Sequence, residues 1–446
     1  MKKTGVVVTV LLLLAVVAVL ELSSCSSDYK PTPGEVGISI GNPSVTDDTT
    51  EEEGTRSGPF DTEPQVTEPD DTDPQETDKP VPEPAESFGE VYEFYYDQLD
   101  EREKELYDAL LECAADGTEV ALIPDYDLNS NDDVMSVIKG AEAFFNDHPE
   151  YFAYCIQNLA AGTYEGVSAL GLYKYEYWEY STSFDRYERE LENGVDRIVK
   201  ETEKNCSNDY EKAQYVHDYL VTHAAYDHEA CDEILNNPTS YNPAYDQVFT
   251  AYGCIVNGDC VCAGYAAAYK LILDRLGIPC VYVTGWGDPT NTDVGHAWNR
   301  IILDGESYYV DITWDDGAEV YDERGNQIYP ESVMYNYFNI TTDELMVTHL
   351  VDEEFFSQPE CDDDTYNYYK YNGYQIDRYD FGKFVDIAES QQGNPAINIC
   401  FTKPSDAAKA ENDFVNGGYQ KIRWLQKYDF GYLFNDTDGC VVIVYK

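Results

Sequence analysis

Basic residues are scarce in this chain of 446 residues. Lysine and arginine together number 28 against 86 aspartates and glutamates, so the formal net charge at pH 7 is -58. A polyanion of this kind repels phosphate backbones and anionic lipid headgroups. The composition therefore argues against a nucleic-acid partner and against a basic membrane-binding patch. It suits the solubility of a surface protein, and it would also suit a cationic substrate such as a lysine-bearing peptide.

The sequence also lacks the spacings that are typical of metal sites. None of its six histidines form a His-x-x-x-His pair, and its twelve cysteines include no Cys-x-x-Cys pair. Structural zinc sites usually take their ligands from such spacings. We therefore expect no metal and no other cofactor.

The apolar run near the N-terminus, residues 6–20, is shorter than the roughly 20 residues that a membrane-spanning helix needs. Lys2 and Lys3 precede it, as in an export signal. The run ends in Leu22-Ser23-Ser24-Cys25, which resembles the cleavage box of bacterial lipoproteins. The resemblance implies a signal peptide over residues 1–25, lipidation of Cys25, and a protein on the extracellular face of the membrane that touches it only through the lipid. The alternative, an uncleaved anchor, also puts the remaining chain outside the cytoplasm.

Residues 26–87 form an acidic segment rich in proline and threonine, with a Thr-Glu-Pro or Thr-Asp-Pro repeat every five residues from Thr62. Such a segment buries too little apolar surface to offset its conformational entropy. Proline stiffens it and like charges extend it. We expect a disordered tether that holds the folded body away from the lipid surface.

Cysteine is abundant for an exported chain, which first suggests disulfides. With Cys25 set aside for lipid, eleven cysteines remain. Because eleven is odd, at least one would be a free thiol even if all the others were paired. The spacing alone does not determine which.

Residues 88–204 show mostly helical periodicity. Helices are expected over residues 90–113, ending at Gly117, over 134–145, ending at His148-Pro149, and over 180–203. A strong helix over 210–223 carries His217 and His223, which are six positions apart and so do not share a face. We interpret both histidines as structural.

One short stretch, Gly258-Asp-Cys-Val-Cys-Ala-Gly, places Cys262 at or just before the start of a helix predicted over residues 263–276. Small residues in that helix permit close packing, and Gly277 is a natural C-terminal cap. At a helix N-terminus the dipole and the backbone N–H groups favour the thiolate over the thiol. Cys262 is therefore a candidate nucleophile, and Cys260 lies in the loop before it.

The next segment predicts a strand over residues 280–286 and then two strands that turn at Asp304-Gly305, a strong hairpin signal. If those two residues form the turn, the numbers of opposed residues sum to 609. Trp298 then faces Asp311, and His296 faces Thr313, so that His296 and Asp311 are diagonal neighbours on one face. A carboxylate in that place can orient an imidazole that exchanges a proton with a thiol.

Three motifs, Cys262-Ala-Gly-Tyr-Ala, Gly295-His-Ala-Trp-Asn and Val310-Asp-Ile-Thr-Trp, closely resemble in order and separation the Cys, His and Asp motifs of bacterial transglutaminase-like proteins. The resemblance covers roughly residues 210–349. It implies an α+β, papain-like core over residues 205–349, in which a nucleophile helix packs on an antiparallel sheet. It also implies Cys262 as nucleophile, His296 as general base and acid, and Asp311 as the orienting residue.

Two features around these motifs are less settled. The oxyanion donor could be the backbone N–H of Cys262, with the Tyr252 side chain as a second candidate. Cys260 departs from the pattern by adding a second thiol beside the nucleophile. It could pair with Cys254, or it could oxidise onto Cys262 and silence it.

Residues 350–446 predict a small α/β domain without a catalytic constellation. Helices are expected over 381–390 and 405–415, and strands over 396–402, 431–434 and 440–445. His349, just before this domain, is interpreted as structural.

The sequence thus predicts a tethered surface lipoprotein that performs cysteine-dependent acyl chemistry on peptide amide bonds. Its substrate would be a protein or peptide, with the cell wall as one source, and hydrolysis is slightly favoured over cross-linking because water is always present. The alternative is a catalytically inactive module on the same fold that binds glycans or peptides.

Overall fold

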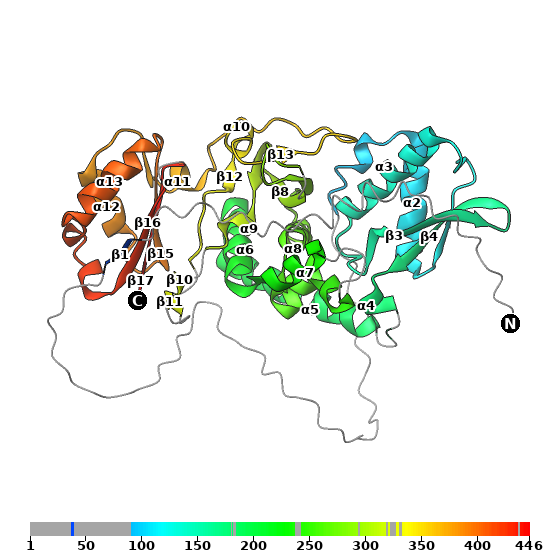
Figure 1. The fold of residues 1–446 in the computed structure, drawn as a ribbon, viewed down its shortest axis with the longest axis horizontal. Coiled ribbons are helices and arrows are strands. Elements are labelled where there is room, and N and C mark those ends of the chain that lie inside the picture. The colour runs from blue at the N-terminus through cyan, green and yellow to red at the C-terminus, as the bar shows by residue number, and fades with distance from the viewer. Residues whose placement is uncertain are drawn as a thin grey trace, which may run out of the picture.

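The computed structural model describes residues 37–39 and 91–446, apart from 180, 182–183, 237–241, 293–294, 318–319, 322–326, 330–331 and 436–437. Cys25 and the predicted signal peptide lie outside the described residues. Figure 1 shows three bodies in a row, an N-terminal one in cyan, a central one in green and yellow, and a C-terminal one in orange and red. Within the described part of the chain, no helix is both long and apolar enough to cross a membrane.

The N-terminal body packs two helices on a three-stranded antiparallel sheet. Its elements are η1 (Tyr96–Gln98), α2 (Glu101–Asp116), β2 (Val120–Leu122), α3 (Asn131–Asp147), β3 (Tyr154–Tyr164) and β4 (Val167–Lys174), with strand order β2-β4-β3. Asp100 and Glu103 form a capping box at the start of α2, and Gly117 ends it in the left-handed conformation, as predicted. The β3–β4 hairpin was not predicted from the sequence.

The central body joins a helical layer to a five-stranded antiparallel sheet of order β12-β9-β8-β7-β13. The helical layer contains α4 (Glu176–Glu179), α5 (Phe184–Asn205), α6 (Asp209–His223), α7 (His228–Asn236), η2 (Pro243–Phe249), η3 (Gly253–Asn257) and α8 (Cys262–Arg275). The sheet strands are β7 (Cys280–Trp286), β8 (Gly295–Leu303), β9 (Glu306–Val310), β12 (Phe338–Ile340) and β13 (Leu350–Val351). Short strands β5 (Ala225–Tyr226) and β6 (Asp259–Cys260) pair in parallel, and β10 (Val320–Tyr321) pairs with β11 (Gln327–Tyr329). This mixed α+β arrangement confirms the predicted fold class.

Helix α8 is the central packing element of this body. Its residues from Cys262 to Asp274 are all buried, and Asn299 of β8 donates a hydrogen bond to the Ala266 carbonyl at 3.0 Å. Gly264 allows this crowding, because a Cβ there would lie 2.6 Å from the Val248 carbonyl oxygen. Close backbone contact thus fixes the N-terminal turn of α8 against the segment that precedes it.

The predicted hairpin register is confirmed. Leu303 pairs with Glu306 and Asn299 pairs with Val310, so the numbers of opposed residues sum to 609. Asp304 and Gly305 both have positive φ, 51° and 90°, as a two-residue turn of type I′ requires.

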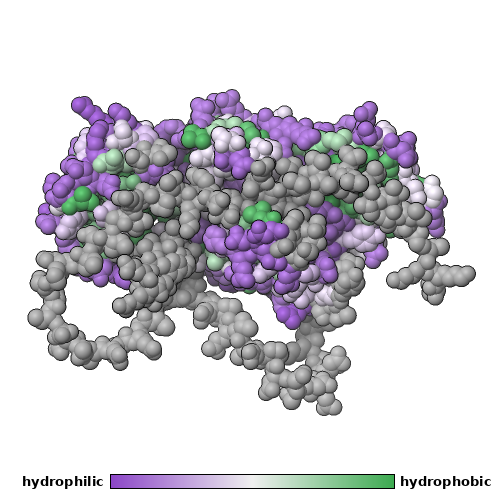
Figure 2. Space-filling view, viewed as in Figure 1, coloured by the Kyte–Doolittle hydropathy of each residue, from purple (hydrophilic) through white to green (hydrophobic). Residues whose placement is uncertain are grey.

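The C-terminal body is a second α/β unit with its own apolar core. It contains α11 (Tyr368–Tyr371), β14 (Gln375–Ile376), α12 (Phe381–Ser390), β15 (Ala396–Phe401), α13 (Ser405–Val415), η4 (Gly418–Lys421), η5 (Leu425–Lys427), β16 (Phe430–Phe434) and β17 (Cys440–Tyr445). Both predicted helices and the final hairpin are therefore confirmed. Within the predicted tether, β1 (Gly37–Ser39) adds to the edge of this sheet by pairing with β16. The rest of the predicted tether over residues 26–87 lies outside the described residues. The face seen in Figure 2 is mainly hydrophilic, with scattered hydrophobic patches.

Candidate active site

The predicted nucleophile, Cys262, is the first residue of α8. Val261 precedes it in an extended conformation as the N-cap, and the Val261 N–H donates to the Val248 carbonyl at 2.9 Å. The sulfur is therefore held at the positive end of the helix dipole, where negative charge is stabilised. Cys262 is fully buried.

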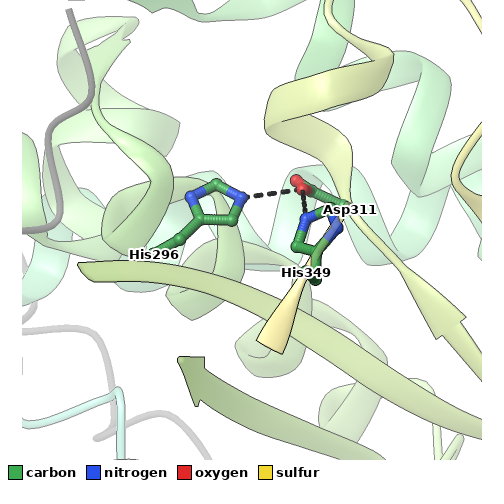
Figure 3. Close-up of side chains that lie close together, drawn as sticks. All are labelled: His296, Asp311 and His349. Atoms are coloured by element: carbon green, nitrogen blue, oxygen red, sulfur yellow. Dashed lines mark hydrogen bonds and ion pairs between the residues drawn. The ribbon is translucent and has the colours of Figure 1, made fainter. Parts of the chain in front are cut away.

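The predicted base, His296, is the second residue of β8 and pairs with Gly285 of β7. Its Nε2 lies 2.7 Å from Oδ2 of Asp311, and Figure 3 shows its other ring nitrogen pointing away from that carboxylate. A hydrogen bond and a charge interaction link the ring to Cys262 as well. His296 therefore stands between the sulfur and the carboxylate.

The route by which Asp311 reaches His296 differs from the prediction. Strand β9 ends at Val310, so the predicted cross-strand pairs of Trp298 with Asp311 and of His296 with Thr313 do not form. Asp311 is instead the N-cap of a short helix, α9 (Ile312–Asp315), and its Oδ1 accepts from the Trp314 N–H at 3.3 Å. An aspartate that caps a helix gives up its place in a ladder, because its side chain and backbone satisfy the first turn.

Charge interactions inside this buried site set the protonation states. Burial alone would lower the pKa of His296, but the charges of Asp311 and Cys262 and the hydrogen bonds to both raise it to about 10. Burial alone would raise the pKa of Asp311, but His296 and then His349 hold it well below its usual range. The ring is thus stabilised as an imidazolium at neutral pH, beside a carboxylate that stays ionised.

The segment that holds these three residues is similar to known proteins. Residues 196–312 match the family model described as the transglutaminase-like superfamily, a range that contains Cys262, His296 and Asp311. The chain contains a transglutaminase-like superfamily domain. It is also 24% identical over 135 residues to kyphoscoliosis peptidase of Mus musculus and 24% identical over 133 residues to that of Homo sapiens, in each case over 28% of this chain and 19% of the relative. The matched segment thus spans about a fifth of the length of these relatives.

Among solved structures, a crystal structure of a TGase is similar to this chain, with 16% sequence identity and a TM-score of 0.27. The similarity covers 38% of this chain and 47% of that one.

His349, which was interpreted from the sequence as structural, contacts Asp311 in the structure. Its Nε2 lies 3.0 Å from Asp311 Oδ2, the same oxygen that receives His296, and Figure 3 shows both rings directed at that carboxylate. This contact was not predicted from the sequence. No local signal could have shown it, since His349 lies 38 residues after Asp311 and outside the matched family range.

The side chain of Tyr252 is placed elsewhere. Its hydroxyl donates to Glu190 at 2.8 Å, and its ring stacks on Phe152 at a centroid distance of 5.4 Å. Because the hydroxyl proton is committed to Glu190, the structure argues against Tyr252 as an oxyanion donor. The backbone N–H of Cys262 stays the predicted donor.

The second thiol next to the nucleophile has a different neighbour. None of the eleven cysteines in the described part of the chain forms a disulfide in this structure. Burial, followed by a hydrogen bond to Cys254, raises the pKa of Cys260 well above its usual value. Cys260 therefore contacts Cys254 as a neutral thiol, and in this structure it is not bonded to Cys262.

Among the described residues, His296, Asp311 and His349 also form a group whose donor atoms lie within 4.8 Å of one another. Two tetrahedral zinc ligands at about 2.0–2.1 Å from the metal would be about 3.3 Å apart. The separations of 2.7 and 3.0 Å seen here are hydrogen-bond lengths instead. The cluster therefore fits proton sharing better than metal ligation.

Two tryptophan rings lie beside His296. The His296 ring lies 5.7 Å from the Trp298 ring and 5.8 Å from the Trp314 ring, between centroids. A Cβ on Gly287 would lie 3.2 Å from Trp314 and 3.7 Å from His296. The glycine lets the backbone pass close over the histidine. Because His296 and Asp311 are buried, the charge interaction between them is stronger than it would be in water.

Proposed function

We propose that the transglutaminase-like domain is a cysteine peptidase or amidase that forms a thioester on Cys262. The observation that carries the proposal is the position of His296, which hydrogen bonds to Asp311 at 2.7 Å and also interacts with Cys262. Acyl transfer to a thiol requires a nucleophile, a proton carrier next to it, and a carboxylate that orients the proton carrier.

In the proposed reaction the Cys262 sulfur attacks the carbonyl carbon of an amide, and the carbonyl π electrons move to oxygen. The backbone N–H of Cys262 stabilises that oxyanion. His296 then gives its proton to the amine nitrogen, the C–N bond breaks, and a thioester is left on Cys262. Water, deprotonated by His296, attacks the thioester and expels the sulfur, which completes hydrolysis.

A lysine amine in place of that water would make the domain a cross-linking transferase. The hydrolytic version is supported by the similarity to kyphoscoliosis peptidase and by the constant presence of water. The protein would act outside the cytoplasm, held through a lipid on Cys25 and the tether of residues 26–87.

One observation favours a second candidate, a binding module that does no chemistry. Cys262 has no exposed surface, so a scissile carbonyl reaches the sulfur only after neighbouring side chains move. If the site never opens, Cys262, His296 and Asp311 stay in place but no substrate reaches the sulfur.

The rate at which Cys262 is alkylated distinguishes an enzyme from a binding module that does no chemistry. With the protein reduced at neutral pH, iodoacetamide should label Cys262 faster than Cys206, although Cys206 is only half-buried. Burial raises the pKa of Cys206, which makes it the slower reference thiol. His296→Ala should slow the labelling of Cys262 and leave Cys206 unchanged. Equal rates at both thiols would contradict the enzyme.

Products separate hydrolase from transferase. A library of glutamine-containing peptides is incubated with the protein, with and without a primary-amine tag, and analysed by mass. Cleavage supports the hydrolase and tag incorporation supports the transferase, each abolished in Cys262→Ala. Neither product would leave the binding module as the better account.

A further inference from the structure

We infer that His349 is a positioning residue for Asp311, a role that rests on the proposed function of the site. The inference comes from one carboxylate oxygen, Asp311 Oδ2, which lies 2.7 Å from His296 Nε2 and 3.0 Å from His349 Nε2. The other oxygen, Oδ1, accepts from the Trp314 N–H. Three donors from different parts of the chain therefore fix both the place and the rotation of this carboxylate.

The tautomer of His349 follows from its two partners. An ionised carboxylate can only accept, so the hydrogen bond to Asp311 places a proton on Nε2. On the other side, Nδ1 lies 2.9 Å from the Thr348 hydroxyl, which is able to donate to it. Burial lowers the pKa of His349, and although the hydrogen bond and charge of Asp311 oppose this, the positive charge of His296 adds to it and the net shift is downward. His349 is therefore a neutral ring with a single, directed N–H.

Neutrality decides what this second histidine does. A cation in the same place would offset the charge of Asp311 and weaken its hold on the imidazolium of His296. A neutral donor stabilises the carboxylate and leaves its charge available to His296. His349 thus orients Asp311 without competing for it.

The surroundings hold the His349 ring in place. Its backbone N–H donates to the Leu345 carbonyl at 2.9 Å, at the end of α10 (Thr342–Leu345), which starts with a capping box. The ring lies 4.3 Å from the Trp314 ring and 5.0 Å from the Trp298 ring. It is fully buried. A side chain fixed on every side loses no freedom when it orients its neighbour.

The test compares His349→Phe, which removes the donor, with His349→Gln, which can place an amide N–H near the position of Nε2. We expect His349→Phe to lower kcat at least tenfold with KM unchanged, and His349→Gln to recover most of the loss. The control is His217→Gln, a change at another fully buried histidine, which should leave kcat of the folded protein unaltered.

The pH profile gives a readout that a merely structural role would not move. The hydrogen bond from His349 helps to hold the pKa of Asp311 low, so its loss raises that pKa. The acid limb of kcat/KM should therefore move to higher pH in His349→Phe and return in His349→Gln. The other ionisable groups that interact with Asp311 are His296 of β8 and Asp315 of α9, and Cys262 of α8 interacts with His296. All three are the same in both variants.

Failure of this inference is distinct from failure of the proposed function. A folded His349→Phe variant with the kcat and acid limb of the wild type would overturn the positioning role. A wild-type protein that forms neither product would instead overturn the proposed function.

A separate observation, in the C-terminal sheet, concerns two thiols. Cys400 of β15 and Cys440 of β17 are directly opposed, and their sulfurs are 3.4 Å apart. The next pair is a hydrogen-bonded one, since the Phe401 N–H donates to the Gly439 carbonyl at 2.9 Å. Cys400 and Cys440 therefore occupy a non-hydrogen-bonded pair, where Cα atoms are about 4.5 Å apart, within the range that disulfides span.

We propose that this pair forms a disulfide by exchange with an external disulfide outside the cytoplasm. The thiolate of Cys400, the more exposed partner, attacks the external disulfide and releases one thiol. The thiolate of Cys440 then attacks the mixed disulfide and releases the second. Both cysteines lose their protons, and the two electrons leave on the external reagent, which departs as two thiols.

The experiment treats the full-length reduced protein with oxidised glutathione and maps its peptides by mass. We expect a Cys400–Cys440 cross-link with a loss of two hydrogens, and a higher Tm than in the reduced protein. Cys400→Ser should show neither change. A stable glutathione adduct on Cys400 without the cross-link, or no reaction at the pair, would overturn the proposal.

Discussion

Two buried histidine–aspartate pairs sit at opposite ends of the same short helix. Asp311 caps the start of α9 and contacts His296, while Asp315, its last residue, contacts His217 at 3.2 Å. In the first pair one carboxylate serves two histidines. In the second pair one histidine lies between two carboxylates, because His217 also contacts Asp218 at 3.0 Å.

Under the proposed function, the difference shows which feature would let such a pair react. Both ring nitrogens of His217 are taken by carboxylates, so the ring has no nitrogen left for a substrate or a thiol. His296 gives one nitrogen to Asp311 and keeps the other on the side of Cys262. Burial and pairing with an aspartate are common to both sites. The sites differ in the partner of the second ring nitrogen, which is the Asp218 carboxylate for His217 and lies on the side of Cys262 for His296.

The largest effect should come from Asp311→Asn. The amide can donate as well as accept, so it no longer fixes the proton of His296 on the correct nitrogen. We expect kcat for peptide cleavage to fall by a factor of about 10²–10⁴. Asp315→Asn is the matched control and should change kcat by less than threefold in the folded protein. A loss of similar size in both variants would erase the contrast between the two pairs.

Next in size is the stability loss in His217→Phe. The change leaves Asp315, which is fully buried, without its cation. Breaking a buried ion pair by removing one partner costs about 3–5 kcal/mol. Urea unfolding should show a loss of that size, whereas the folded fraction should keep its kcat. A loss below about 1 kcal/mol would mean that the pair does not support the fold.

Alkaline pH should separate the two pairs again. Burial would lower the pKa of His217, but hydrogen bonds to Asp218 and Asp315 raise it to about 9, whereas its unfolded value is about 6.5. Its contribution to stability is therefore complete below about pH 6.5 and is lost as the pH rises through about 9. The wild type minus His217→Gln difference in unfolding free energy should shrink over that window.

The proton of His296 is held to a higher pH. Its pKa of about 10 means that the general acid is lost only as the pH rises through that value. In a short assay on still-folded protein, kcat/KM should therefore decline later than the stability contribution of His217 does. A decline that begins near pH 7 would contradict the assigned protonation state.

The smallest effect should come from Thr348→Val. It removes the hydroxyl that lies 2.9 Å from Nδ1 of His349, and with it the group that favours the Nε2–H tautomer. We expect a two- to fivefold decrease in kcat and a stability loss of about 1 kcal/mol. Thr341→Val, which removes the cap of α10 instead, should reduce stability alone. An unchanged kcat in Thr348→Val would show that the Thr348 hydroxyl is not needed and that Asp311 alone sets the tautomer of His349.

Much of the fold could be predicted because its signals are local. The helix that starts at Cys262, the strand Cys280–Trp286 and the turn at Asp304-Gly305 each carry their own periodicity, cap or turn residues. The β3–β4 hairpin does not. Its strands mix tyrosine, isoleucine, threonine and valine with alanine, leucine and glycine, so their strand preference is weak. The turn at Glu165-Gly166, with φ of 51° and 87°, is a second signal of the hairpin.

The site was predictable only in part for a similar reason. Cys262, His296 and Asp311 were found from their motifs, and the structure brings them together. The end of β9 at Val310 was missed, because the capping preference of Asp311 competes with the strand preference of the residues around it. His349 and the engagement of Tyr252 by Glu190 depend on long-range packing, for which a single sequence carries no signal.

The N-terminal body packs against the central sheet, and this contact matters for the design of protein fragments. The family match ends at Ile312, yet His349 lies beyond it. The N-terminal body, which precedes the family match, also contacts the sheet. The Tyr95 hydroxyl donates to the Tyr282 carbonyl, and Trp298 belongs to the apolar cluster of the N-terminal body. A truncated protein cut at the family boundaries would expose one side of its sheet to water and leave Asp311 short of a donor. The shortest piece worth expressing runs from the start of the N-terminal body to at least β13.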